Sequence, residues 1–197
     1  MTIRGPSWQR AMVIVIALTF LAGPGATDDS SPSTPQPVDE LDLDQYTGLW
    51  YEIARLPNKF QRKCARDVTA HYARLDERRI EVVNSCTRED GQRIASSGVA
   101  RLAHRGGPAA KLEVRFAPGW LSWLPWVWAD YWILEVGPAY EYALVGTPNR
   151  EYLWVLSREP DLGPAAWEHL LGVAQEQGYD VDQLVVTPQT SADDDLD

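Results

Sequence analysis

Gly48-Leu49-Trp50-Tyr51-Glu52-Ile53-Ala54-Arg55 is the stretch of this chain that decides its fold. It follows a short acidic segment, 41–46, and opens a series of short alternating segments. A glycine at the start of a first strand lets another piece of backbone cross closely, and a tryptophan two positions later is large enough to fill the floor of a barrel. This order predicts a closed β-barrel.

The residues that follow alternate between β-prone segments and turn residues. We predict eight strands, near 48–56, 67–75, 79–87, 93–103, 110–116, 130–137, 140–146 and 152–158. The connectors carry turn dipeptides such as Asp90-Gly91 and Pro118-Gly119. Eight consecutive strands with short connections favour an all-β fold, an eight-stranded up-and-down antiparallel barrel, over a sandwich.

One later segment has helical periodicity. Pro164 suits a first helical turn and Gly178 can end the helix. Apolar side chains recur between them at helical spacing, at Trp167, Leu170, Leu171 and Ala174. A single apolar stripe of this kind predicts one C-terminal α-helix packed on the outside of the barrel. A last extended piece follows at 182–187.

The first residues read as a targeting segment. Arg4 and Arg10 precede the uncharged apolar run 11–22, and small residues follow it, which is the order of a secretory signal peptide. The run is shorter than the ~20 residues that span a bilayer, so a permanent anchor is the weaker interpretation. We therefore assign residues 1–26 to a signal peptide. No cysteine near the expected cleavage site could carry a lipid, so we expect a protein exported to the periplasm or cell envelope without a lipid anchor.

The rest of the chain divides by composition. Residues 27–37 are rich in Ser, Pro and Asp and are predicted to be a disordered linker, and 190–197 to be an acidic disordered tail. The remaining 38–189 is the size of one domain. The formal net charge of −10 becomes −12 once the two arginines leave with the signal peptide. Such an acidic surface argues against nucleic acid as a partner.

The chain has two cysteines, Cys64 and Cys86, which flank the two arms of a predicted hairpin. In an oxidising compartment these residues are expected to form a disulfide. A turn at residue 77 places Cys86 opposite residue 68 instead of 64, so one arm must bend or bulge. A reactive thiol at Cys64 is the alternative.

Four segments of the chain resemble those of a known family. The segments 48–58, 140–146, 152–160 and 177–180 resemble the lipocalins, and most closely the bacterial outer-membrane lipocalins similar to apolipoprotein D. The resemblance covers about 41–189, essentially the whole domain. It implies a ligand-binding barrel.

The resemblance also implies how the barrel floor is built. The family's first-strand Trp and its Arg after the last strand match Trp50 and Arg158, whose guanidinium is expected to lie over the indole, with Gly48 beside them. The family's Thr-Asp-Tyr turn is only partly present, as Pro138-Ala139-Tyr140. Tyr140 is still expected to pack at the floor. Many bacterial relatives are lipoproteins, and this chain lacks the cysteine they require.

Strand alternation sends every second side chain into the barrel. The alternation predicts a mainly apolar, aromatic-rich cavity whose ligand-binding residues are Glu52, Ala54, Tyr72, Asn84, Val114, Phe116, Trp132, Tyr142 and Trp154. Such a cavity suits a lipid, either a fatty acid or a lysophospholipid, in cell-envelope lipid storage, transport or repair. The alternative is a structural or interaction module whose barrel is filled by its own side chains.

Glu52 is the sharpest of these positions. A buried carboxylate must find a partner or take up a proton. Tyr or Arg neighbours can satisfy it, or it can meet a ligand head group.

The loop 118–130, between the fifth and sixth strands, is unusually rich in tryptophan. By strand count it lies at the open mouth of the barrel, and it carries Trp120, Trp123, Trp126 and Trp128. Tryptophan favours the membrane interface, so we hypothesise a lid or foot that contacts a membrane transiently. The alternatives are a plug folded over the mouth and a contact in a homodimer.

The sequence does not point to an enzyme. His71, His104 and His169 are isolated, and no spacing suits a metal or a cofactor. Nucleophile elbows and phosphate-binding glycine loops are missing as well. Catalysis by a Cys64 thiol would require that the disulfide is absent.

Overall fold

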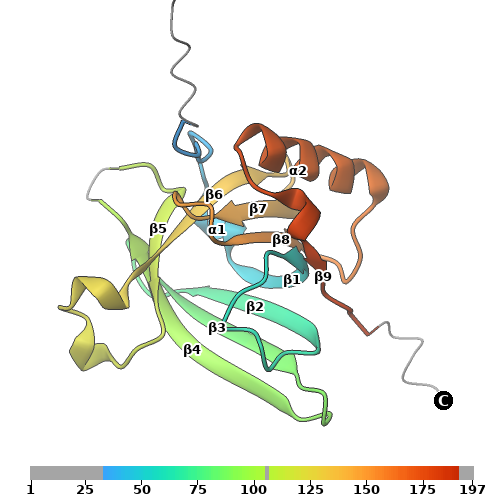
Figure 1. Ribbon diagram of the computed structural model, residues 1–197. Helices are drawn as coiled ribbons and strands as arrows, with labels where there is room; N and C mark the ends of the chain where they lie inside the picture. The colour runs from blue at the N-terminus through green and yellow to red at the C-terminus, as the bar shows by residue number, and fades with distance from the viewer. Residues whose placement is uncertain (1–32, 105–106, 191–197) are drawn as a thin grey trace, which may run out of the picture. The chain divides into compact units, whose positions relative to one another are not determined.

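The computed structural model describes residues 33–104 and 107–190 (Figure 1). The predicted signal peptide, 27–32 of the predicted linker and 191–197 of the predicted tail lie outside the described residues.

Eight strands of a barrel follow one another along the chain. They are β1 (Gly48–Arg55), β2 (Arg66–Arg74), β3 (Arg79–Thr87), β4 (Arg93–Leu102), β5 (Lys111–Arg115), β6 (Ala129–Val136), β7 (Tyr142–Gly146) and β8 (Leu153–Ser157). Their ends differ from the predicted ones by at most two residues. The smaller elements are α1 (Leu43–Tyr46), η1 (Gly119–Leu121), η2 (Pro125–Val127), η3 (Val181–Gln183) and a short β9 (Val185–Val186).

The strands close into a barrel. Each is antiparallel to its neighbour, and β1 pairs with both β8 and β2. The β1–β2 pairing runs only from Gly48 to Tyr51, and β9 pairs with β1 at Ala54 and Arg55. The ninth strand therefore covers the part of β1 that β2 has left. The predicted eight-stranded up-and-down barrel is confirmed, with one extra strand.

The predicted C-terminal helix is α2 (Pro164–Glu176), which packs on the outer face of the barrel (Figure 1). Leu170 and Ala174 are buried, and they share a cluster with Leu144 and Val155 of the strands beneath. Gly178, with φ of +81°, ends the helix in the left-handed conformation that glycine adopts without strain.

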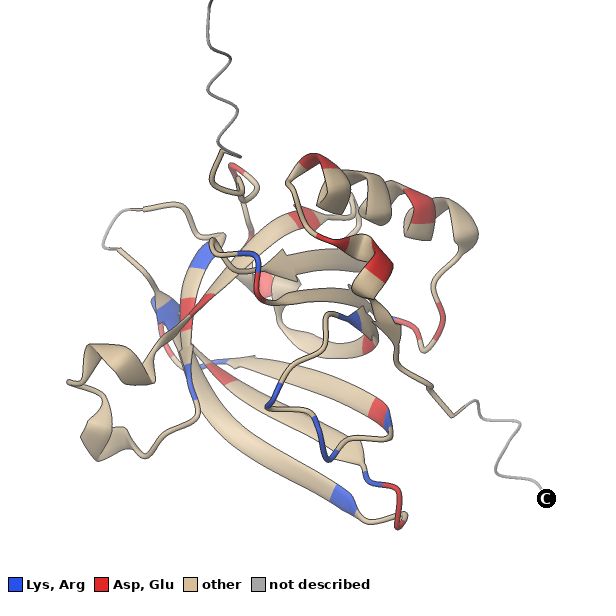
Figure 2. Cartoon of the chain, viewed as in Figure 1, with Lys and Arg blue, Asp and Glu red and all other residues tan. Residues whose placement is uncertain are grey.

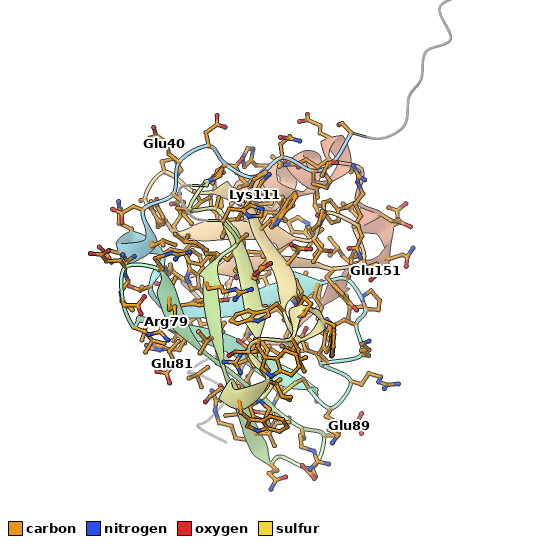
Figure 3. All side chains as sticks on the ribbon, turned by 90° about the vertical axis from the view of Figure 1, so that its left-hand side faces the viewer. Glu40, Arg79, Glu81, Glu89, Lys111 and Glu151 are labelled. Carbon is orange, nitrogen blue, oxygen red and sulfur yellow. A yellow bond between two sulfur atoms is a disulfide. The ribbon has the colours of Figure 1, made fainter. Side chains whose placement is uncertain are left out.

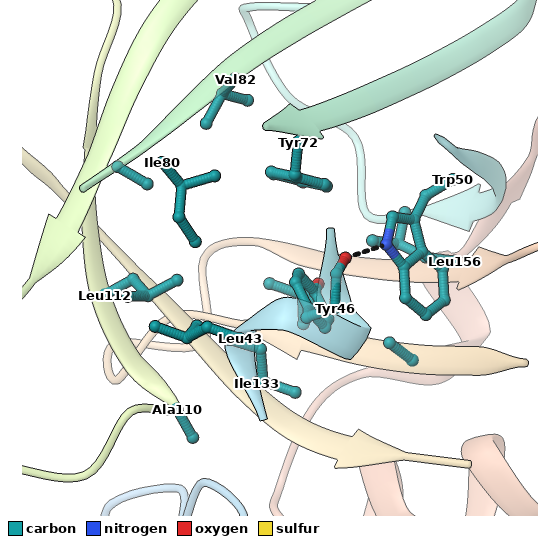
Figure 4. Close-up of a cluster of buried hydrophobic side chains, with 13 residues drawn as sticks. Leu43, Tyr46, Trp50, Tyr72, Ile80, Val82, Ala110, Leu112, Ile133 and Leu156 are labelled. Carbon is teal, nitrogen blue, oxygen red and sulfur yellow. Dashed lines mark hydrogen bonds between the residues drawn. The ribbon is translucent and has the colours of Figure 1, made fainter. Parts of the chain in front are cut away.

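One end of the barrel, here called the floor, is filled by side chains (Figure 4). Trp50 and Tyr46 are fully buried there, and the Trp50 Nε1 donates to the Tyr46 carbonyl at 2.8 Å. On β3, strand alternation places the charged residues outside: Ile80 and Val82 are buried, while Arg79 and Glu81 project outward (Figure 3). The opposite end, here called the mouth, carries the loops 56–65, 88–92, 116–128 and 147–152.

The packed chain begins before the first strand. Pro35 is fully buried, and the backbone N–H of Gln36 donates to the Gln177 side chain at 2.6 Å. Val38 N–H donates to the carbonyl of Ile133 at 3.0 Å. The last residues assigned above to the linker 27–37 thus contact the domain.

The disulfide between Cys64 and Cys86 is confirmed, with Cα atoms 5.5 Å apart. The expected irregularity lies in β2, where the register with β3 shifts between Arg66 and Thr69 and Asp67 has φ of +53°. The bond attaches the mouth loop 56–65 to the end of β3. Since the chain's two cysteines are both consumed, the free-thiol alternative at Cys64 is wrong.

We predict that the disulfide contributes measurably to stability. It closes a loop of 22 residues, for which chain entropy gives roughly 3 kcal/mol. Urea unfolding with and without reductant should show a free energy of unfolding lower by about 2–4 kcal/mol after reduction. A Cys64→Ser/Cys86→Ser variant is the control, because reductant should not change its unfolding midpoint. An unchanged midpoint in the reduced native protein would contradict the prediction.

Candidate ligand cavity

Above the packed floor the barrel is hollow. A cavity of about 680 Å³ lies between the floor and the mouth. Tyr72, Tyr131 and Leu156 line it, whereas Tyr46, Trp50 and Ile80 of the packed floor do not. The barrel is thus packed at one end and open at the other.

The cavity wall is mainly apolar. Its aliphatic part comes from six strands and the loop 116–128, and comprises Val68, Ala70, Val82, Ile94, Ala95, Ala100, Val114, Ala117, Val127, Ala129 and Leu156. Its aromatic part comprises Phe60, Tyr72, Phe116, Trp126, Trp128, Tyr131, Tyr152 and Trp154. Lys59, Gln61 and Asp130 bring polar groups to the mouth. A wall of this kind receives an apolar body and leaves a polar end near solvent.

Six of the nine predicted ligand-binding residues line this cavity: Glu52, Tyr72, Asn84, Val114, Phe116 and Trp154. The other three, Ala54, Trp132 and Tyr142, do not. The orientation predicted for these three is wrong, for two different reasons.

Ala54 is reversed by a bulge in β1. Glu52 pairs with Leu156 across the sheet, but Ala54 pairs with Val155, so the register shifts between them. Because an extra residue interrupts the alternation, Ala54 turns outward and joins the cluster under α2.

Trp132 and Tyr142 lie on strands whose outer face is also apolar. The Trp132 ring packs outside, with Lys111 Nζ 4.4 Å from its centroid, and the Tyr142 ring centroid is 6.1 Å from that of His169 on α2. The buried inward residues are their neighbours Ile133 and Ala143. Because α2 covers the outer face of β7, both faces of that strand are apolar. On β6 the acidic residues Asp130 and Glu135 are five positions apart and so indicate opposite phases.

Tyr131 is a candidate ligand-binding residue that the prediction missed, because the predicted inward and outward faces of β6 were reversed. Its hydroxyl lies 3.0 Å from that of Tyr46 and 2.7 Å from that of Tyr72, which makes a chain of three hydroxyl groups. Burial raises the pKa of Tyr72 to about 12 and raises those of Tyr46 and Tyr131 well above their usual value. The three hydroxyls are therefore neutral hydrogen-bonding groups at the inner end of the cavity.

Glu52 is buried and fully partnered. Its Oε1 accepts from Arg55 at 3.1 Å and from Thr187 at 2.6 Å. Its Oε2 accepts from Gln61, which in turn accepts from the Trp154 Nε1 at 3.1 Å. Of the two hypotheses for this carboxylate, satisfaction by neighbours is the one the contacts support. Gln61 was not singled out in the sequence, yet it holds the mouth loop against the cavity wall.

At the floor, Arg158 lies over the Trp50 ring, with its guanidinium carbon 3.8 Å from the ring centroid. It also donates to the carbonyls of Leu49 and Gln45, at 2.8 and 2.7 Å. A Cβ at Gly48, which has φ of +97°, would lie 3.3 Å from the guanidinium. The glycine therefore lets Arg158 approach β1.

The tryptophan-rich loop stands at the mouth. Trp120, Trp123 and Trp126 expose 75, 76 and 76% of their surface. Trp128 differs, because Arg101 packs over its ring at 3.8 Å and its Nε1 donates to the Ser122 carbonyl. Trp120 and Trp123 are thus exposed to solvent, and Trp126 is exposed at the rim of the cavity. Trp128 packs against the barrel and attaches the loop to it.

Comparison with known proteins agrees with this architecture. Residues 41–189 match the family model described as a lipocalin-like domain. The chain belongs to the lipocalin family.

This lipocalin is 40% identical to temperature-induced lipocalin-1 of Arabidopsis thaliana over 78% of its own length and 82% of that protein. It is 33% identical to the outer membrane lipoprotein Blc of Escherichia coli K12, over 81 and 88% of the two chains. Mouse apolipoprotein D is 31% identical over 82 and 84%. The resemblance stated from the sequence is confirmed.

A solved structure supports the fold alone. Apocrustacyanin C1 superposes with a TM-score of 0.62 at 20% identity, covering 77% of this chain and 81% of the other. Lipocalins bind small hydrophobic ligands and are generally not enzymes. Within residues 33–104 and 107–190, no group of three His, Cys, Asp or Glu side chains could hold a metal ion.

The partial family turn still serves the floor of this lipocalin. Tyr140 has φ of +59°, its carbonyl accepts from Arg158 Nε at 3.2 Å, and its hydroxyl accepts from the Asp42 N–H at 2.8 Å. The departure from Thr-Asp-Tyr has not removed the tyrosine's contacts.

The buried tyrosines predict a loss of stability at alkaline pH. Their pKa values are higher in the folded than in the unfolded protein, so the stabilisation is complete below pH 10 and is lost as the pH rises through the folded values. For Tyr72, a pKa of about 12 in place of 10 corresponds to roughly 3 kcal/mol.

Tyrosinate absorbance of native and urea-unfolded protein, titrated from pH 9 to 13, tests this. The native protein should show a group of tyrosines that ionise only near or above pH 12, and a Tyr72→Phe/Tyr131→Phe variant should lack part of that group. Ionisation of all tyrosines together near pH 10 in the native protein would refute the prediction.

Proposed function

We propose that this lipocalin is an exported protein that carries a single-chain lipid, a fatty acid or a lysophospholipid, in its barrel. The observation that supports this is the open, apolar cavity of about 680 Å³. Its volume lies within the range of roughly 300–1,000 Å³ that is typical of ligand pockets. The filled-barrel alternative holds only for the floor.

The polarity of the wall orients such a ligand. The acyl chain lies against the aliphatic and aromatic wall, where each Å² buried contributes roughly 25 cal/mol. The head group lies at the mouth, near Lys59 and Gln61. Among the described residues the Lys59 ammonium has no carboxylate partner within 4.0 Å, so it is available to an anionic head group.

Export is part of the proposal. It draws on the basic, apolar, small-residue order of 1–26 and on the Cys64–Cys86 disulfide, which is typical of oxidising compartments. The E. coli relative is by name an outer membrane lipoprotein. Storage, transport or repair of envelope lipid is the role we propose, without a lipid anchor.

Filling part of the cavity should weaken ligand binding. We expect Val114→Trp to weaken binding of hexadecanoic acid about tenfold, because an indole that displaces about 60 Å² of ligand contact costs roughly 1.5 kcal/mol. Val83→Trp is the matched control, since Val83 lies on the opposite face of β3 from the cavity-lining Val82 and Asn84. Titration calorimetry measures both. Equal affinities of the two variants would contradict the carrier proposal.

A second proposal concerns the mouth, which is built to contact a membrane. The tip of the loop 116–128 has no charged residue, and the neighbouring loop 56–65 is basic (Figure 2). Its cations are Lys59, Arg62 and Lys63, with Arg66 at the start of β2. Exposed tryptophans suit the lipid interface, and each nearby cation adds roughly 1 kcal/mol toward an anionic surface.

Replacing Trp120, Trp123 and Trp126 with Ser should abolish co-sedimentation with vesicles that contain anionic phospholipid. Binding of hexadecanoic acid should remain in Trp120→Ser/Trp123→Ser, which keeps the cavity-lining Trp126. Leu75→Ser is the control, because Leu75 is also exposed but lies in the β2–β3 turn at the floor. Vesicle binding that survives the triple change would rule out the membrane contact. Light scattering on the same proteins tests the homodimer alternative, which requires a dimer that the triple change dissociates.

A further inference from the structure

The three tyrosine hydroxyls at the inner end of the cavity have unequal surroundings. Tyr46 comes from α1, Tyr72 from β2 and Tyr131 from β6, and Tyr131 stands in the middle of the chain of hydroxyls. Tyr72 and Tyr131 line the cavity. Tyr46 does not line it, and it is fully buried.

A count of protons shows that one donor is left over. Each hydroxyl carries one proton, so three protons serve the two hydrogen bonds that join the three oxygens. Within 33–104 and 107–190, the hydroxyls of Tyr46 and Tyr72 have no other hydrogen-bond partner. One of the three protons therefore has no protein acceptor.

The direction of the hydrogen bonds decides which hydroxyl carries that proton. If Tyr131 accepted from both neighbours, its own proton would be the spare one and could meet the cavity contents. If Tyr72 donated to Tyr131 and Tyr131 to Tyr46, the spare proton would be enclosed in the floor without an acceptor, which is costly. If Tyr46 donates to Tyr131 and Tyr131 to Tyr72, the spare proton belongs to Tyr72 and can meet the cavity contents. The spare proton is therefore favoured on Tyr72 or Tyr131, which both line the cavity.

The acceptor that this donor needs is a neutral oxygen. Lys59, at the mouth, is the one Lys or Arg among the residues that line the cavity. Arg158 is stacked on the Trp50 ring in the floor and does not line the cavity. A carboxylate at the inner end would be a buried charge without a partner. A hydroxyl, ketone or epoxide oxygen accepts the hydrogen bond without that cost.

We infer that the Tyr72 and Tyr131 hydroxyls form a polar subsite at the inner end of the cavity, which selects acyl chains that carry a neutral oxygen over plain chains. This rests on the proposed function. A plain chain that fills the inner end displaces water from the Tyr72 hydroxyl and offers no acceptor in return. An oxygenated chain replaces the hydrogen bond.

Titration calorimetry with hexadecanoic acid and with its isomers hydroxylated at mid-chain or at the omega end tests the inference. At least one hydroxylated isomer should bind wild-type protein about three- to tenfold more tightly than the plain acid, the effect of one net hydrogen bond. Without the subsite an added hydroxyl should weaken binding, because it removes apolar contact.

Three variants locate the effect. Tyr72→Phe/Tyr131→Phe should lose the preference for the hydroxylated acid and keep affinity for the plain acid. Tyr46→Phe should keep the preference, because two hydroxyls joined by one bond still leave one donor. Tyr142→Phe, on the outer face, should behave as wild type.

The outcomes separate the two proposals. If plain and hydroxylated acids bind wild-type protein equally, or if the double variant keeps the preference, the subsite is wrong and the carrier function stands. If neither acid binds wild-type protein, both are wrong. The wild-type comparison decides the matter even if the double variant fails to fold.

Discussion

The stack of Arg158 on Trp50 is the interaction on which the rest of the barrel depends. One guanidinium covers the indole and donates to the carbonyls of Leu49, Gln45 and Tyr140. It thereby connects β1, α1 and the β6–β7 turn to the end of β8. A flexible lysine could not supply this planar fork of donors. Because the floor is closed in this way, the barrel does not need side chains that fill its upper half in order to stay closed.

Four further features keep the upper half of the barrel hollow yet stable. The bulge in β1 turns Ala54 toward α2, so that the strand serves the cavity with Glu52 and the outer core with the next residues. The strand β9 then covers the edge that β2 leaves. Gln61 and the disulfide attach the mouth loop to the wall without occupying the space inside. The cavity is thus maintained by contacts at its rim and floor.

The sequence predicted what depends on local pattern. Trp50, Arg158, the eight strands and α2 follow from spacing and from the family resemblance. Strand alternation placed Tyr72 of β2 and Asn84 of β3 correctly in the cavity wall. The phase of Tyr142 could not be predicted in the same way, because α2 makes the outer face of β7 as apolar as the inner one. Ala54 was misplaced because a bulge has no reliable sequence signal. Gln61 and the tyrosine chain depend on contacts between residues far apart in the chain, which no periodicity reports.

The two ends of the cavity therefore suit different oxygen-containing groups of a ligand. At the mouth, Glu52 is already satisfied by Arg55, Thr187 and Gln61. We therefore expect Lys59, which has no carboxylate partner among the described residues, to be the group that meets a ligand head group. At the inner end, burial holds the tyrosine hydroxyls neutral, so they bind by dipole and not by charge. A charged group is thus stable at the mouth and costly at the inner end. We expect this difference to orient a ligand in the cavity even though most of the wall is apolar and has no directional preference.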